Sequence, residues 1–391
     1  MNAKKTPRKI CVFSGKRGGF GAYVPLLRLM EKDPALEPEI ILGDMHASEE
    51  FGATADEAGL LFPGIPVHVI SMGTGRGDTA AIRAENIGAC MTEAGRLLAD
   101  IRPDIVMVHG DRGEHLAVAL AALTLNITVA HTQGGDISGN IDDIIRHGIT
   151  KLAHLHFPET REAARRIARM GEEASRIHTV GSLYIDRIVK KIYPDPDKTR
   201  KKYSVAPGER LGIFVYHPET GRTGEENGRA ARTILSAAAE SGLGIIAVYP
   251  CSDPGYRGII SALHETGSRY PAVRVHKNIP HLDFLSLMSS ADVLLGNSSA
   301  AIKEGPYLRI PALNFGSRQE GRPREASVID CRAATADIRK KINFVSRDAS
   351  FRKKLARCGT HLGDGRASER ILAVLKKISL DKGFFNKKMT Y

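Results

Sequence analysis

Short apolar runs rich in valine and isoleucine alternate along the chain with longer stretches of helical spacing. Such alternation predicts parallel sheets built from strand–helix–strand units. In the first half of the chain, strands are expected at residues 10–14, 39–42, 67–70, 105–109, 128–131, 155–157 and 179–180. In the second half they are expected at 211–216, 244–249, 273–276, 293–295, 311–315 and 328–330. The pattern predicts an α/β protein with two Rossmann-like, doubly wound domains that face a central cleft.

A short polar segment separates the two sets of strands. Residues 193–198 contain Pro194, Pro196 and several charges, which suits a solvated connection better than the interior of a helix or strand. We therefore expect a first domain over residues 1–192 and a second over residues 199–375, each large enough for its own core. Residues 376–391 form a basic tail, and residues 381–391 are polar enough to fray.

The composition disfavours several classes of protein. No apolar run approaches the roughly 20 residues of a membrane helix, the longest being residues 116–125. Residues 1–9 lead into a short strand rather than into the longer apolar region of a secretion signal. The five cysteines are scattered and include no C-x-x-C pair, so neither a disulfide framework nor a zinc site is expected. These features favour a cytoplasmic protein with no membrane partner.

The formal net charge of +12 favours anionic ligands. Nucleotide phosphates and acidic lipids both fit that charge. Nucleic acid is disfavoured, because lysine and arginine are spread along the chain, aromatic residues make up only 6%, and no nucleic-acid-binding module is visible.

Polar residues gather where the predicted strands end. Four loops follow strands directly: residues 110–114, 132–136, 217–219 and 296–299. Open α/β sheets bind ligands at the carboxyl ends of their strands, where loops and helix N-termini converge. We therefore expect these four loops to meet in one cleft between the domains.

Several of these residues also have a purely structural interpretation. Asp111 is equally suited to cap the helix that follows it. Asp142 and Arg146, four residues apart, have the spacing of a surface ion pair, and so do Asp143 and His147.

The helix expected from residue 141 has a stripe of apolar residues that orients it against the sheet. The stripe consists of Ile141, Ile145, Ile149 and Leu152. The first turn of this helix, which carries Asp142, should then lie close to Asp136.

Two loops have the composition of phosphate-binding sites. Gly296, Asn297, Ser298 and Ser299 precede a helix, so their amides and hydroxyls suit an anion, although a capped turn has the same sequence. The glycine-rich segment 15–21 matches neither the Walker loop nor the dinucleotide fingerprint, which disfavours ATP and NAD. No cofactor is expected.

A metal site is also not expected. His154 and His156 lie two apart on a predicted strand and face the same side, but the sequence supplies no third ligand beside them.

The residues in these loops resemble those of the hydrolysing UDP-N-acetylglucosamine 2-epimerases of sialic acid and related nonulosonic acid biosynthesis. The most specific stretch is residues 134–154, whose small, acidic and basic positions are close to the family pattern. Residues 110–112, 217–219, 296–299, Glu304 and 316–322 also match. The resemblance extends from the first strand to about Arg370.

The resemblance implies a fold like that of the GT-B glycosyltransferases, with the sugar nucleotide between the domains. It implies elimination of the nucleoside diphosphate, an enzyme-bound 2-acetamidoglucal, and addition of water to give a free N-acetylmannosamine-type sugar. A homodimer or homotetramer is typical of such enzymes.

The resemblance assigns catalysis to Asp111, Asp136, Asp142 and His217, of which His217 would also hold the pyrophosphate with Ser298 and Ser299. It assigns substrate or nucleotide binding to Arg17, His46, Arg112, Arg146, His147, Ser182, Gly296, Asn297, Ser298, Ser299, Glu304, Arg318 and Arg322.

Two departures from the family pattern affect the expected substrate. The family usually has glutamate where this chain has Asp136, and an acidic residue where it has Gly19. A variant sugar such as UDP-diacetylbacillosamine or a GDP-linked sugar is therefore an alternative substrate. Other readings are a GT-B glycosyltransferase, a non-hydrolysing epimerase and a non-catalytic sugar-nucleotide sensor.

Overall fold

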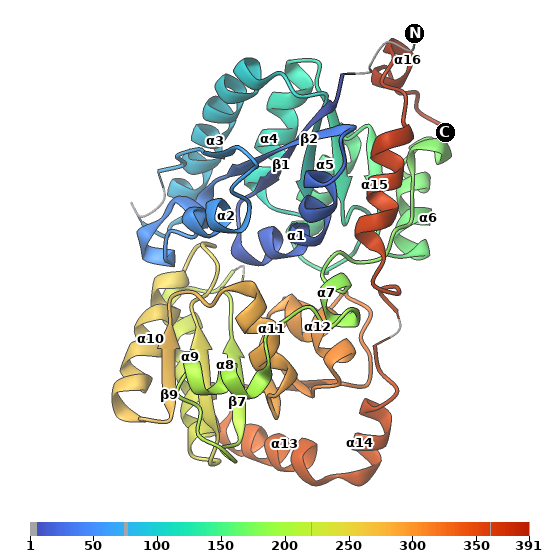
Figure 1. Cartoon of the computed structure of the whole chain (residues 1–391). Helices are drawn as coiled ribbons and strands as arrows, with labels where there is room; N and C mark the ends of the chain where they lie inside the picture. The colour runs from blue at the N-terminus through green and yellow to red at the C-terminus, as the bar shows by residue number, and fades with distance from the viewer. Residues whose placement is uncertain (1–5, 74–76, 220, 360, 391) are drawn as a thin grey trace.

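The computed structural model describes residues 6–73, 77–219, 221–359 and 361–390. In these residues the chain forms two parallel six-stranded sheets covered by helices, one above the other in Figure 1. The first sheet contains β1 Arg8–Ser14, β2 Leu36–Leu42, β3 Val67–Val69, β4 Ile105–His109, β5 Thr128–Thr132 and β6 Leu155–Phe157. The second contains β7 Leu211–Val215, β8 Gly244–Val248, β9 Val273–His276, β10 Val293–Gly296, β11 Ala312–Phe315 and β12 Val328–Cys331.

Helices connect the strands and cover both faces of each sheet (Figure 1). In the first half they are α1 Arg17–Glu31, η1 Asp44–Ala47, η2 Glu49–Phe51, α2 Ala55–Leu61, α3 Ala80–Ile101, α4 Gly113–Thr124, α5 Asp142–Leu152, α6 Arg161–Arg169, η3 Ala174–Arg176 and α7 Asp186–Val189. In the second half they are α8 Pro196–Lys202, α9 Gly224–Ala239, α10 Tyr256–Arg269, α11 His281–Ser289, α12 Ser299–Leu308, α13 Thr335–Arg347, α14 Ala349–Leu355, α15 Ala367–Lys377 and α16 Lys382–Phe385.

The two sheets have the same strand order. The first runs β3-β2-β1-β4-β5-β6 and the second β12-β11-β10-β7-β8-β9. The winding therefore reverses between β1 and β4 in the first domain and between β7 and β10 in the second. Such reversal points open a crevice at the carboxyl ends of the strands. The predicted fold class is confirmed.

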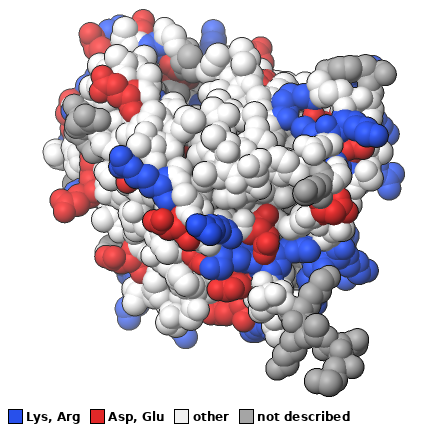
Figure 2. All heavy atoms as spheres, turned by 90° about the horizontal axis from the view of Figure 1, so that it is seen from above, with Lys and Arg blue, Asp and Glu red and all other residues white. Residues whose placement is uncertain are grey.

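The inner strands are rich in apolar residues because both faces of each sheet are buried. In β4 all five residues are buried, and the same is true of β5 and β8. Seen from above the first domain, basic and acidic side chains are interspersed with uncharged ones over the surface (Figure 2). No helix within the described ranges is long and apolar enough to cross a membrane.

Three local predictions are wrong, beginning with the strand at residues 179–180. Beyond β6 only an isolated bridge forms, between His156 and Ile177. The Val180 amide donates to Pro158 O. Pro158 has no amide hydrogen to return, so the ladder ends there.

The polar connection at residues 193–198 is also more ordered than predicted. Pro196 begins α8, and the Asp195 side chain caps that helix by accepting a hydrogen bond from the Lys198 amide. Proline suits the first turn of a helix, since the amide it lacks has no intrahelical partner there.

The tail is the third correction, because it docks instead of fraying. The Lys387 ammonium donates to Ala153 O at 2.8 Å and to the buried Glu172 carboxylate at 2.8 Å. A group of opposite charge beneath the tail thus holds it in place, which the tail's own composition does not reveal.

Helix α15 returns to the first domain. Its residues Ile371 and Leu375 are fully buried in the same core as Ile10 and Leu27, and the helix lies beside α1 (Figure 1). The sequence-based boundary had placed this helix in the second domain. The chain therefore passes between the domains twice.

Candidate active site

Four loops meet between the domains at the two reversal points. The chain leaves β1 through Lys16, β4 through Asp111, β7 through His217 and β10 through residues 297–299. A cavity of about 470 Å³ lies where these loops face one another. The predicted binding residues that line it are Arg17, His46, Arg112, His217, Ser298, Ser299, Glu304 and Arg318.

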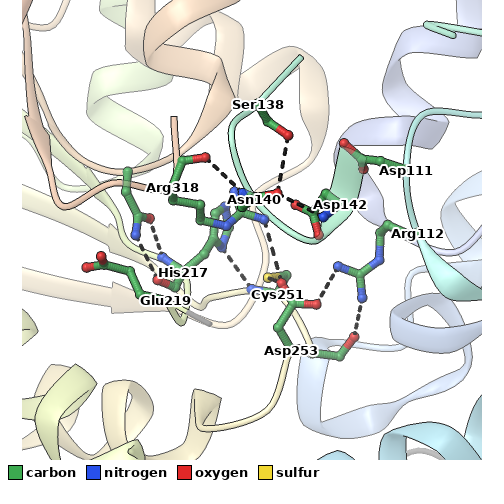
Figure 3. A network of polar contacts seen from close by, with 12 residues as sticks. Asp111, Arg112, Ser138, Asn140, Asp142, His217, Glu219, Cys251, Asp253 and Arg318 are labelled. Carbon is green, nitrogen blue, oxygen red and sulfur yellow. Dashed lines mark hydrogen bonds and ion pairs between the residues drawn. The ribbon is translucent and has the colours of Figure 1, made fainter. Parts of the chain in front are cut away.

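The three predicted catalytic aspartates lie behind this cavity in one polar layer. The Asp111 carboxylate pairs with the fully buried guanidinium of Arg146. Arg322 connects two of the acids, because its guanidinium lies 3.7 Å from Asp111 and 3.5 Å from Asp136. Asp142 lies beside Asp111 at the start of α5 (Figure 3).

The aspartates have opposite pKa shifts. Burial works to raise the pKa of Asp111, but the charges of Arg146 and Lys16 hold it well below the ordinary value. Burial and the negative charge of Asp111 raise the pKa of Asp142. Burial also raises the pKa of Asp136, although Lys303 and Arg322 oppose the shift. Asp111 is therefore the permanently ionised member of the group.

The helix cap by Asp111 and the ion pair between Asp142 and Arg146, which the sequence also allowed, do not form. Asp111 caps no helix, because α4 begins at Gly113 with Arg112 at the cap position and no side-chain cap. Asp142 does not pair with Arg146, which instead contacts Asp111 and Asp143. The proposed apolar stripe of α5 is shorter than predicted.

That stripe begins one turn later, since Ile141 is 48% exposed whereas Ile149 is fully buried. Ile141 is the N-cap residue and precedes the first turn of α5.

His217 presents a hydrogen-bond donor. The Cys251 amide donates to Nδ1 of His217 at 3.0 Å (Figure 3). Burial and the nearby charge of Arg318 lower the pKa of His217 well below its ordinary value. The ring is therefore neutral, and since Nδ1 accepts, the proton lies on Nε2.

Asn297 fixes the position of His217. Its side-chain oxygen accepts from the His217 amide at 2.7 Å, and its side-chain nitrogen donates to His217 O at 2.9 Å. Gly296 allows the strands to approach, because a Cβ there would lie 1.9 Å from Val215 O. Asn297 and Gly296 thus fix the backbone that carries His217 into the second-domain wall of the cavity.

Helix α12 begins at the second-domain wall. Ser298 is its N-cap, and its hydroxyl accepts from the Ala300 amide at 3.3 Å. The free amides of the first turn and the helix dipole attract an anion. Ser298 and Ser299 both line the cavity, so an anion bound there would face the first domain.

A polar bridge joins the two domains beside the cavity. Arg112 donates to Asp253 at 2.7 Å (Figure 3). It also donates to Ser252 at 3.2 Å. Ser252 in turn donates to the buried Asp44 at 2.7 Å. Arg318 lies 3.6 Å from Asp253, which therefore balances two arginines.

Arg17 also crosses between the domains. Its guanidinium donates to the backbone carbonyls of Lys277 and Tyr249, the latter at 3.1 Å. Most of its hydrogen-bonding capacity is thus used by the protein itself.

Some predicted binding residues have protein partners. His46 accepts or donates hydrogen bonds to Ser14 and Thr54, and burial lowers its pKa to about 3, so it is neutral. Glu304 lies 3.9 Å from His281.

Six predicted binding residues do not line the large cavity: Arg146, His147, Ser182, Gly296, Asn297 and Arg322. Ser182 donates to the buried Glu159 at 2.6 Å. His147 is half-buried on α5, and Nδ1 of its ring has no hydrogen-bond partner among the described residues. Their roles stay predictions.

The sequence reasoning missed several charged residues of this site, among them Asp44, Asp253 and Lys303. Asp44 and Asp253 follow the carboxyl ends of β2 and β8, so the rule that singled out Asp111 also applies to them. Lys303, within α12, has no local signal, yet its buried ammonium bonds Glu159 and lies 3.5 Å from Asp136.

The two histidines considered as metal ligands have other partners. His154 accepts from the Val129 amide at 3.1 Å, and His156 contacts Glu172 at 3.2 Å. No group of three or more candidate ligands comes together in the part of the chain that the structure describes.

The fold and the cleft define a protein of the GT-B-like class, with two Rossmann-like domains. The chain belongs to the UDP-N-acetylglucosamine 2-epimerase family, whose sequence profile matches residues 28–376. It is 30% identical to the UDP-N,N'-diacetylbacillosamine 2-epimerase (hydrolyzing) of Legionella pneumophila, over 98% of this chain and 100% of that protein. It is 32% identical to the UDP-N-acetylglucosamine 2-epimerase of Neisseria meningitidis, over 94% of this chain and 95% of that protein.

Solved structures share the fold. The UDP-GlcNAc 2-epimerase of Neisseria meningitidis, solved with UDP-GlcNAc, aligns with a TM-score of 0.78 and 19% identity, covering 95% of this chain and 100% of that one. The Methanocaldococcus jannaschii enzyme, solved with UDP-GlcNAc and UDP, aligns with a TM-score of 0.76 and 22% identity, covering 94% and 99%.

Proposed function

We propose that this protein is a hydrolysing 2-epimerase. It converts UDP-N-acetylglucosamine, or a closely related UDP- or GDP-linked 2-acetamido sugar, into the nucleoside diphosphate and a free N-acetylmannosamine-type sugar. The observation that carries this proposal is the opposition of two walls. One wall has aspartates with divergent pKa values, and the other has the N-terminus of α12 with a neutral histidine donor.

The acid wall suits proton transfer at carbon 2 of the sugar. The proton there is weakly acidic, so the base benefits from a raised pKa. Asp142 has one, and the fixed negative charge of Asp111 beside it maintains the shift. When the surroundings of two titratable groups move their pKa values apart, one group can act as the acid and the other as the base. We assign proton abstraction to Asp142 and an electrostatic role to Asp111.

The surroundings of Asp136 support a role in the second half of the reaction. It lines a small cavity of about 80 Å³ together with Arg322, which is large enough for water. Its raised pKa suits a group that exchanges a proton with that water. We assign it to the hydration half of the reaction.

The donor wall suits departure of the diphosphate. As the base removes the carbon 2 proton, the bond from carbon 1 to the phosphate oxygen breaks, and both its electrons leave with that oxygen. The His217 Nε2–H, Ser299 and the amides of α12 stabilise the charge that develops. Water then adds to the 2-acetamidoglucal, with hydroxide joining carbon 1 and a proton joining carbon 2 from the opposite face.

The names of the relatives narrow the range of candidate sugar substrates. The Legionella protein and a Campylobacter jejuni relative, 29% identical over 83% of this chain, are named for N,N'-diacetylbacillosamine. The Neisseria protein is named for N-acetylglucosamine. Together with the short Asp136 side chain, these names make UDP-diacetylbacillosamine the second candidate substrate.

Product analysis tests the proposal. The protein is incubated with UDP-GlcNAc, UDP-diacetylbacillosamine and GDP-linked N-acetylhexosamines, without acceptor, and the products are followed by ¹H and ³¹P NMR. A free 2-epimerised sugar and a nucleoside diphosphate are expected. An epimer that stays nucleotide-linked would indicate a non-hydrolysing enzyme. If almost no product forms, a glycosyltransferase is favoured. If the sugar nucleotide binds without any turnover, a non-catalytic sensor is favoured.

A variant of Asp136 tests the site. Asp136→Asn should abolish turnover and leave UDP affinity within about threefold, because Asp136 does not line the cavity that contains His217, Ser298 and Ser299. Rates near those of the wild type would refute its role.

A further inference from the structure

Lys16 presents an unpaired positive charge to the cleft. It follows β1 directly, stands at the N-cap position of α1 and lines the large cavity. Within the described residues its ammonium group has neither a hydrogen bond nor an ion pair. Its stem passes over Gly19, where an added Cβ would lie 3.5 Å from Cγ of Lys16. That distance is an ordinary van der Waals contact, so the lysine stem packs closely over the first turn of α1.

Two acids of this part of the cleft, Asp111 and Asp253, already have cations of their own. Asp111 attracts the Lys16 ammonium but pairs with Arg146 and Arg322. Asp253 is balanced by Arg112 and by a second arginine. Lys16 is therefore a surplus cation, and burial disfavours its charged form. A ligand anion in the cavity would remove this cost.

The position of Lys16 indicates which anion it meets. Its charge acts on Asp111 of the first domain and on His217 of the second, so it lies between the acid wall and the donor wall. The neighbouring cation, Arg17, gives its guanidinium to backbone carbonyls. Among the described cations that line the cavity, Lys16 is thus the one whose charged group has no hydrogen bond or ion pair to the protein, whereas Arg112 and Arg318 both face Asp253.

We propose that Lys16 binds the diphosphate of the sugar nucleotide from the first-domain side, holds it against the N-terminus of α12 and stabilises it as it leaves. This proposal rests on the proposed function for the identity of the ligand. The diphosphate would then lie between a lysine of one domain and the amides and histidine of the other.

Binding measurements test the proposal without relying on activity. Titration calorimetry with UDP and GDP first identifies the tighter nucleotide. Lys16→Met should weaken its binding about 10- to 100-fold, as expected for one lost charge-assisted hydrogen bond. The corresponding nucleoside lacks phosphates, so its affinity should stay within about twofold. Lys16→Arg should restore diphosphate binding to within about threefold of the wild type.

Thermal unfolding supplies a readout that a merely structural role would not produce. Removing an unpaired, partly buried charge should raise the melting temperature of the free Lys16→Met protein, while the extra stabilisation given by UDP should shrink. Lys32→Met is the matched control, since Lys32 is exposed at the far end of α1, and it should change neither value.

If Lys16→Met binds the diphosphate within threefold of the wild-type affinity, the proposal is overturned, whether or not turnover falls. If Lys16→Met does not fold, Lys16→Gln in the same titrations decides the question. Failure of the proposed function is a separate result: the wild type would bind diphosphate through Lys16 and yet release no sugar.

Discussion

Lys303 holds two acids of the first domain from a helix of the second. Its ammonium bonds Glu159 and lies 3.5 Å from Asp136, and its side chain is 4% exposed. Lys303→Met leaves both carboxylates buried without this cation. Breaking a buried ion pair in this way costs about 3–5 kcal/mol. With an unfolding entropy of about 2.1 cal/mol/K per residue, a chain of 391 residues should lose about 4–6 °C of melting temperature.

The loss should depend on pH. In the wild type, burial works to raise the pKa of Glu159, but Lys303 keeps it below the ordinary value. Without Lys303, at least one acid takes a folded-state pKa above its unfolded value. Such a group holds its proton more tightly when folded, so stability falls as pH rises above about 4.3. The deficit of the variant should therefore grow between pH 5 and pH 8, by up to about 1.4 kcal/mol per pH unit for each acid affected.

Scanning calorimetry at pH 5, 6, 7 and 8 measures this deficit. The double variant Lys303→Met, Glu159→Gln should regain most of the loss, because glutamine removes the stranded charge and can still accept from Ser182. Lys353→Met, on the exposed side of α14, should melt with the wild type. A deficit below about 1 °C that does not vary with pH would refute the reasoning.

Three further predictions concern catalysis and stability. Asp142→Asn should lower kcat by about 10²–10⁴ with UDP affinity within about threefold, and a rate near that of the wild type would remove it as the base. Burial lowers the pKa of His46 to about 3 and that of His115 to about 4, well below the unfolded value of about 6.5. Stability should thus fall as pH drops below about 6.5, by about 1.4 kcal/mol per pH unit for each histidine, and equal urea midpoints at pH 7 and pH 5.5 would contradict this. Lys387→Met removes three hydrogen bonds from the docked tail and should cost about 1–3 kcal/mol in urea unfolding, whereas the exposed Lys388→Met should cost almost nothing.

The strands and the positions of the polar loops were predictable from sequence for one physical reason. Strands buried on both faces are rich in apolar residues, so β4 and β10 stand out, and the polar residues after them mark the open edge of the sheet. Every strand except the predicted one at residues 179–180 was found within a few residues of its place.

Contacts between distant segments were not predictable. The spacing of α15 shows that one face is apolar, but it does not say that the partner of that face is α1. The sequence around Lys303 shows only an ordinary helical lysine, because its partner Glu159 belongs to the other domain. Of the adjacent cations Lys16 and Arg17, the sequence favoured Arg17, whereas the phase of α1 turns Arg17 toward backbone carbonyls.

The return of α15 to the first domain affects how the cleft opens. One covalent passage lies between α7 and α8, and the other lies between α14 and α15. Two tethers restrict the lobes to bending about the line through both passages, and they oppose swivelling of one lobe on the other. We therefore expect any opening of the cleft to keep Lys16 and Asp111 on a fixed path opposite His217, so that nucleotide entry and the alignment for catalysis use the same motion.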